Sequence, residues 1–168
     1  EQLLTQSAGQ AFSATEKELL LHKGALLELY QEGSAKSILL LIQTAHASPH
    51  PAIRASAVAL LADLAQHKNV AALEGLFDLV ICHHQEDALA QIRTAAFRSS
   101  RPAVQAIFYL LSGQYPEYRH MDPHHGILTE FFFNRMDGEL QERLLISASR
   151  ANLREWLILV NALLANHP

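Results

Sequence analysis

One short pattern occurs twice within the first 97 residues of this 168-residue chain. Each copy has a polar residue, an Ile-Arg pair five and six residues later, and an alanine three residues after the arginine. The copies are Ser48, Ile53, Arg54 and Ala57, and then Asp87, Ile92, Arg93 and Ala96. The two arginines are 39 residues apart, and the residues between them are patterned as the rest of one helix and all of another. A two-helix repeat of this length predicts an α-solenoid, in which successive units stack on one another.

Apolar residues recur at helical spacing along the whole chain, which predicts an all-α fold of about eight helices. The strongest stripe is Val104, Ile107, Phe108 and Leu111, at positions i, i+3, i+4 and i+7. Comparable stripes predict helices over about 13–31, 35–46, 51–67, 70–83 and 87–97, with others after 100, 122 and 137 and a last one over 151–165. Residues 35–46 are apolar nearly all round, which predicts a central helix. Asp87 and Ser100 are the predicted N-caps of their helices, and Pro51 suits a first helical turn.

A third unit with an insertion is predicted from a second spacing. Asp137 precedes Arg143 by six residues, as Asp87 precedes Arg93. Arg93 and Arg143 are 50 residues apart, which exceeds the first period of 39 by 11. The surplus matches an irregular stretch, for which we expect an insertion at about 112–124.

The composition is that of an ordinary folded protein. Hydrophobic residues make up 49% and charged residues 18%, with a formal net charge of −4. A chain of this size buries roughly 70% of its unfolded surface, so we expect one domain over 1–168, with 1–12 frayed. The acidic balance argues against a protein that binds phosphate backbones.

The single cysteine, Cys82, cannot form an internal disulfide bond and is expected to be a small buried residue. This favours a reducing compartment, and we expect a cytoplasmic protein. The sequence has no run of about 20 apolar residues, so no membrane crossing is expected.

The repeated pattern resembles the HEAT-repeat family, whose units have an acidic residue at a turn, a Val/Ile-Arg pair and an alanine in the second helix. The resemblance covers about residues 35–112. It implies a right-handed α-solenoid of about eight antiparallel helices. It also implies that the Asp and Arg positions tie neighbouring repeats together, with a structural role: Arg54, Asp87, Arg93, Asp137 and Arg143.

A second resemblance rests on one stretch, residues 106–118, together with the helices after it. This stretch is similar to segments of large bacterial proteins that combine helical repeats with WD-repeat propellers or nucleotidases. That resemblance implies a linker or scaffold role.

The insertion contains the residues most suggestive of a binding site. Insertions in solenoids tend to lie on one face, and Tyr and Arg are frequent interface anchors, so Tyr115, Tyr118 and Arg119 are the candidate partner-binding residues. The alternative is that Tyr115 and Tyr118 cover the ends of adjacent helices. His120 and His124 have i, i+4 spacing, but Pro123 lies between them, so we expect loop histidines and no metal site.

These observations predict a non-catalytic protein–protein interaction or scaffold module without a cofactor. No Gly-x-Ser-x-Gly elbow or phosphate-loop pattern is present in the sequence. The expected partner is another protein or another domain of a larger parent chain; neither membrane nor nucleic acid is expected. The alternative is a HEAT-like enzyme or ligand-binding domain, because HEAT-like DNA glycosylases and bilin lyases exist.

Overall fold

The computed structural model describes residues 14–134, 137–151, 157–158, 160–161 and 165. Within residues 14–151 these ranges form nine α-helices, and the described residues include no β-strand. The helices are α1 (Ala14–Glu32), α2 (Ala35–Ala47), α3 (Pro51–Gln66), α4 (Val70–His83), α5 (Glu86–Ala95), α6 (Pro102–Leu111), α7 (Tyr115–Met121), α8 (Gly126–Asn134) and α9 (Gly138–Ala151). The predicted all-α class is therefore confirmed. The helix predicted over 151–165 lies mostly outside the described residues.

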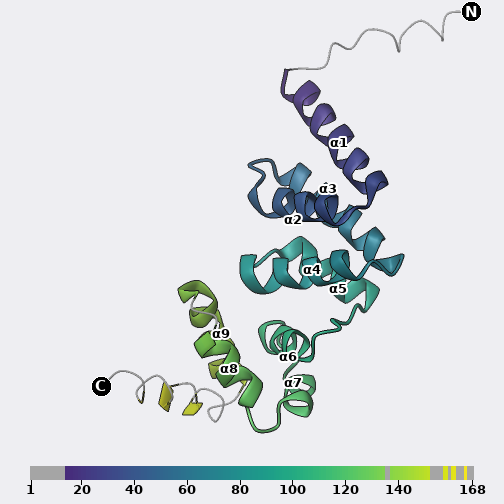
Figure 1. The fold of residues 1–168 in the computed structure, drawn as a ribbon. Coiled ribbons are helices and arrows are strands. Elements are labelled where there is room, and N and C mark those ends of the chain that lie inside the picture. Colours follow the sequence, from purple (N-terminus) through teal and green to yellow (C-terminus); the bar gives the residue numbers. More distant parts are fainter. Residues whose placement is uncertain (1–13, 135–136, 152–156, 159, 162–164, 166–168) are drawn as a thin grey trace, which may run out of the picture.

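The helices follow one another along the molecule, and each packs mainly against its neighbours (Figure 1). α1 lies at one end and packs on α2 and α3, whereas α4 packs on α2, α3, α5 and α6. At the other end, α6 contacts α7, α8 and α9. α4 and α6 therefore connect the two ends of the fold.

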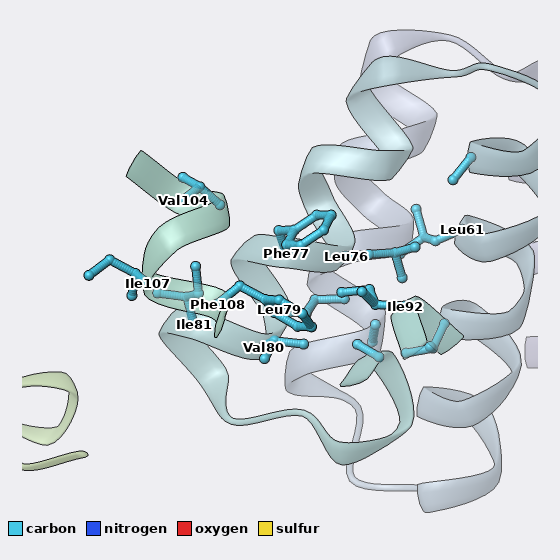
Figure 2. Close-up of a cluster of buried hydrophobic side chains, with 14 of the residues drawn as sticks. Leu61, Leu76, Phe77, Leu79, Val80, Ile81, Ile92, Val104, Ile107 and Phe108 are labelled. Carbon is cyan, nitrogen blue, oxygen red and sulfur yellow. The ribbon is translucent and has the colours of Figure 1, made fainter. Parts of the chain in front are cut away.

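The centre of the core lies between α4 and α6. Figure 2 shows Phe77 of α4 close to the apolar face of α6, with Leu76 extending toward Leu61 of α3. The rings of Phe77 and Phe108 meet edge to face with their centroids 5.0 Å apart, an arrangement that aromatic pairs favour. Of the predicted stripe of α6, Val104, Ile107 and Phe108 are buried and Leu111 is half-buried.

α2 is less central than its composition predicts. Its Leu39 and Leu40 are exposed, with relative accessibilities of 54% and 38%, while the opposite face is buried. The buried face approaches α4 so closely that a Cβ atom on Gly75 would overlap the side chain of Ile42. On α1, Leu26 is buried, whereas Leu20 and Leu27 are at least half exposed.

Two predicted N-caps are wrong, because the helices begin one or more residues away. α5 has Gln85 as its N-cap, and Asp87 lies exposed in the first turn. The negative charge of Asp87 there still interacts favourably with the positive end of the helix dipole. α6 has Arg101 as its N-cap, and Ser100 instead donates to Glu74. The expected first-turn position of Pro51 in α3 is confirmed.

The irregular stretch expected near 112–122 is largely a short helix. α7 begins at Tyr115, and Pro116 is the next residue. Proline is tolerated in the first turn of a helix because the N–H groups of that turn have no partner within the helix. Gly113 precedes it with a φ of +77°, a conformation that glycine adopts without strain. Most of this stretch is therefore a helical connection between α6 and α8.

Three arginines for which a structural role was predicted donate hydrogen bonds to carbonyl oxygens at the C-terminal ends of helices. Arg54 donates to Ser48 at the end of α2 (2.7 Å), and Arg93 donates to Ser112 at the end of α6 (2.6 Å). Arg143 donates to Val80 and Ile81 in the last turn of α4 (2.9 and 2.7 Å). A cation at this position satisfies unpaired carbonyl groups and the negative end of the helix dipole.

The two copies of the repeat differ in their helices. Ala57 is fully buried inside α3, whereas Ala96 is exposed and follows the end of α5, with a φ of +52°. Ile53 and Ile92 are both buried. The apolar position of the pattern is thus equivalent in the two copies, and the alanine position is not.

None of the helices in the described part of the chain is both long and apolar enough to cross a membrane.

Candidate basic groove over α5, α6 and α7

Two adjoining hollows lie along α5, α6 and α7, and together we call them the basic groove. The first has a volume of about 420 Å³ and is lined by Ile92, Arg93, Ala96, Phe97, Arg98, Phe108, Tyr109 and Gln114. The second has a volume of about 360 Å³ and is lined by Arg98, Tyr109, Pro116, Glu117, His120 and Met121. Arg98 and Tyr109 line both hollows, so the two lie side by side.

The end of α5 shapes the first hollow. Ala96 adopts the left-handed conformation, and the N–H of Phe97 donates to the carbonyl oxygen of Ile92 (3.0 Å). The N–H of Ala96 itself donates to Arg93 (3.2 Å), which completes the Schellman motif that ends many helices. This turn places Phe97 beside Ile92 in the wall of the groove.

Two arginines give the groove its positive charge. Arg93 is exposed, and its hydrogen bond to Ser112 holds the guanidinium group at the wall of the groove. Arg98 is also exposed. Neither forms a salt bridge with a carboxylate among the described residues, so both retain donors for an incoming anion. Half-buried Tyr109, between the two hollows, adds an aromatic surface.

A polar network on α4 holds the connection that carries Arg98. Glu74 accepts hydrogen bonds from the hydroxyl groups of Ser99 and Ser100 (2.6 and 2.8 Å), and it pairs with Arg101 (2.6 Å). Burial raises the pKa of Glu74, but the hydrogen bonds from Ser99, Arg101 and Ser100 outweigh burial and leave that pKa below its ordinary value. The ionised carboxylate thus fixes the segment that follows Arg98.

Tyr118, one of the three predicted partner-binding residues, is completely buried. Its hydroxyl group lies 2.9 Å from Nδ1 of His125 and donates to the carboxylate of Asp122 (3.3 Å). The same carboxylate accepts the N–H groups of Ile127 and Leu128 at the start of α8. Tyr118 therefore organises the turn between α7 and α8 and leaves no side-chain surface for a partner.

The other two predicted residues are half-buried. Tyr115 packs against the core, and Arg119 donates to the carbonyl oxygen of Ala151 at the end of α9 (2.8 Å). The three residues do not form one exposed patch.

The histidines of the insertion are divided between surface and core. His120 and His124 are exposed, whereas His125 is buried against Tyr118 with a φ of +57°. The potential ligand atoms of Glu18, His22 and His50 lie within 4.8 Å of one another, on α1 and at the junction of α2 and α3.

Sequence reasoning did not single out the groove residues Arg98 and Tyr109. Both lie in stretches with a helical or loop pattern, and only the path of the α5–α6 connection brings them together. An arginine directly after a helix end, without an acidic residue at i±3 or i±4, was the one signal that could have indicated the groove.

Comparison with protein-family models, curated proteins and solved structures finds no match to this chain. The groove is therefore interpreted from its own chemistry.

Proposed function

We propose that this chain is a non-catalytic scaffold module, and that the basic groove binds an acidic segment of another protein or of another domain of a longer parent chain. The observation that carries the proposal is the pair of exposed arginines, Arg93 and Arg98, beside the aromatic ring of Tyr109. Guanidinium groups without internal carboxylate partners bind carboxylates in a bidentate manner, and Tyr and Arg are enriched at protein interfaces.

The charge of the whole chain supports a peptide over a nucleic acid. A net charge of −4 opposes the approach of a long polyanion, whose binding requires many phosphate contacts. The groove offers two arginines and His120, and Glu117 also lines it. A short segment with one or two carboxylates and an apolar side chain matches this set better than a phosphate backbone does.

The HEAT-like α-solenoid is part of the same proposal. Its support is the burial of Ile53 and Ile92 at equivalent positions and the bonding of Arg54 and Arg93 to helix ends. A cytoplasmic location is also proposed, from the single cysteine, Cys82, which is half-buried.

Peptide selection tests the proposal while the partner is still unidentified. Random 12-residue peptides displayed on phage are selected on the immobilised chain, and enriched sequences are synthesised with a fluorescent label. We expect enrichment of Asp and Glu beside an apolar residue. Fluorescence anisotropy then compares the parent chain with Arg98→Glu and with Arg150→Glu, which makes the same charge change on the exposed face of α9.

We expect Arg98→Glu to weaken binding at least tenfold, and Arg150→Glu to leave it within twofold. A labelled single-stranded oligonucleotide serves as the nucleic-acid probe. Equal weakening by both variants would indicate a nonspecific charge effect and contradict the groove assignment. Tighter binding of the oligonucleotide than of any selected peptide would favour nucleic-acid binding instead.

A further inference from the structure

Three metal-ligating side chains come together at the end of the fold opposite the basic groove. Glu18 and His22 lie one helical turn apart on α1, and His50 lies at the junction between α2 and α3. One potential ligand atom from each residue lies within 4.8 Å of the other two. The set therefore joins two elements that are 28 residues apart in the sequence, counting from His22 to His50.

We propose that Glu18, His22 and His50 form a binding site for a divalent transition metal ion of the zinc class. Two imidazoles and one carboxylate are a usual donor set for such an ion, and three protein ligands leave a position for water or another ligand. In a tetrahedral zinc site with bonds of about 2.0–2.1 Å, the ligand atoms are about 3.4 Å apart. The ligand atoms lie within 4.8 Å of one another, so metal binding requires a small rotation of the side chains of Glu18 and His22, which are exposed.

The backbone around His50 favours a fixed ligand position. His50 lies between Pro49 and Pro51, which restrict the neighbouring backbone angles, and its N–H donates to the hydroxyl group of Ser48 (3.3 Å). His50 is the N-cap residue of α3, but its side chain makes no capping hydrogen bond. Its imidazole can therefore bind a metal ion without loss of the helix start.

The spacing on α1 supplies the other half of the site. Residues at i and i+4 lie on one face of a helix, so Glu18 and His22 point to the same side. The rings of His22 and His50 have centroids 6.1 Å apart. All three ligands line a hollow of about 510 Å³ whose wall includes Leu26 and Leu29 of α1. An ion bound here lies at the wall of that hollow.

The site has a structural consequence for α1. This helix exposes Leu21, with a relative accessibility of 76%, and its one buried side chain among the described residues is Leu26. Leu26 and the hydrogen bond from Tyr30 to Asp63 of α3 hold its C-terminal half, whereas partly buried Leu19 is the core contact of its N-terminal half. A metal ion held by Glu18, His22 and His50 would fasten the N-terminal half of α1 to the start of α3.

Calorimetric titration of the complete chain with ZnCl₂, without an affinity tag, tests the site. We expect one saturable site per chain. His22→Ala and His50→Ala should each weaken zinc binding at least tenfold. His124→Ala, which removes an exposed histidine of the α7–α8 connection, should change binding less than twofold. Both cluster variants are expected to fold, which circular dichroism checks.

Hydrogen exchange provides a second readout that is specific to the joining of two elements. Zinc should slow amide exchange in the first half of α1 at least fivefold in the parent chain and leave it unchanged in His50→Ala. The proposal is overturned if the parent chain shows no saturable binding, or if His22→Ala weakens binding while His50→Ala does not. It is also overturned if His124→Ala weakens zinc binding as much as the cluster variants do.

Discussion

The guanidinium group of Arg143 on α9 donates a hydrogen bond of 2.7 Å to the carbonyl oxygen of Ile81 in the last turn of α4, 62 residues earlier in the chain. A second bond reaches Val80, so one side chain satisfies two carbonyl groups at a helix end. Burial lowers the pKa of Arg143, whereas nearby Glu139 acts in the opposite direction. The guanidinium group of Arg143 therefore links α9 to the C-terminal end of α4.

Replacement of Arg143 should destabilise the fold. Arg143→Ala removes hydrogen bonds from a charged donor and leaves two carbonyl groups without it, for which we expect a loss of about 1.5–3 kcal/mol in the free energy of unfolding. Arg150→Ala, on the exposed face of the same helix, should change it by less than about 0.5 kcal/mol. Urea denaturation measures both, and equal losses would contradict the role assigned to Arg143.

Replacement by glycine should have opposite effects on stability at Ala96, which is in the left-handed conformation, and at Ala90, which lies inside α5. Ala96→Gly should stabilise the protein by up to about 1 kcal/mol, because glycine adopts this conformation without a steric cost. Ala90→Gly, at an exposed position inside α5, should destabilise it by about 1 kcal/mol. Thermal unfolding compares the two variants. A destabilised Ala96→Gly variant would show that the helix does not end as described.

Stability should decrease below neutral pH because of His83. Partial burial lowers the pKa of His83 from 6.5, and the ring of His46, stacked at 3.5 Å, adds to this, although Asp137, Asp78 and Glu139 act in the opposite direction. Below about pH 6.5 the unfolded chain binds a proton more readily than the folded chain, so the free energy of unfolding falls as pH falls. Much of the His83 side chain remains in contact with solvent, which screens the effect. We therefore expect the free energy of unfolding to fall by about 0.5 kcal/mol.

Urea titrations between pH 7.5 and 5.5 measure this dependence. His83→Gln should reduce the slope of the free energy of unfolding against pH. Identical slopes for the parent chain and His83→Gln would show that the stacked pair does not contribute.

Tyr118 and Tyr115 should respond differently to loss of the hydroxyl group. Tyr118→Phe leaves Nδ1 of buried His125 without this partner, and we expect a loss of about 1–3 kcal/mol in the free energy of unfolding. Tyr115→Phe should cost less than about 0.5 kcal/mol. Chemical denaturation separates the two, and an unaffected Tyr118→Phe variant would contradict a structural role for the cluster.

Local patterns predicted most of the helices because each stripe is short-range. Ser34 caps α2 and Asn69 caps α4, and each side chain accepts a hydrogen bond from the N–H group three residues later. Such local contacts involve residues that are close in the sequence. The error at Asp87 is one of boundary, because α5 begins at Glu86 and Gln85 is its N-cap. The error at Ser100 arose because a tertiary partner competes with the local cap. Ser100 bonds to Glu74, which is 26 residues away.

The groove and the metal cluster depended on long-range packing. Glu18 and His22 have a recognisable i, i+4 spacing, but the third ligand, His50, comes from a different element. Tyr118 resembled an interface anchor in the sequence, and its burial follows from the chain's turn at Asp122 into α8. Residue type alone does not distinguish a tyrosine that binds a partner from one that satisfies a buried histidine.

Arg98 is proposed to bind a carboxylate of a partner, and a charge exchange tests this contact most directly. Anisotropy is measured for the tightest selected peptide and for versions with each acidic residue replaced in turn by Lys, against the parent chain and Arg98→Glu. We predict that Arg98→Glu binds the acidic peptide at least tenfold more weakly than the parent chain does. It should bind one Lys-containing version more tightly than it binds the acidic peptide. Unchanged binding of the acidic peptide by Arg98→Glu would contradict the account.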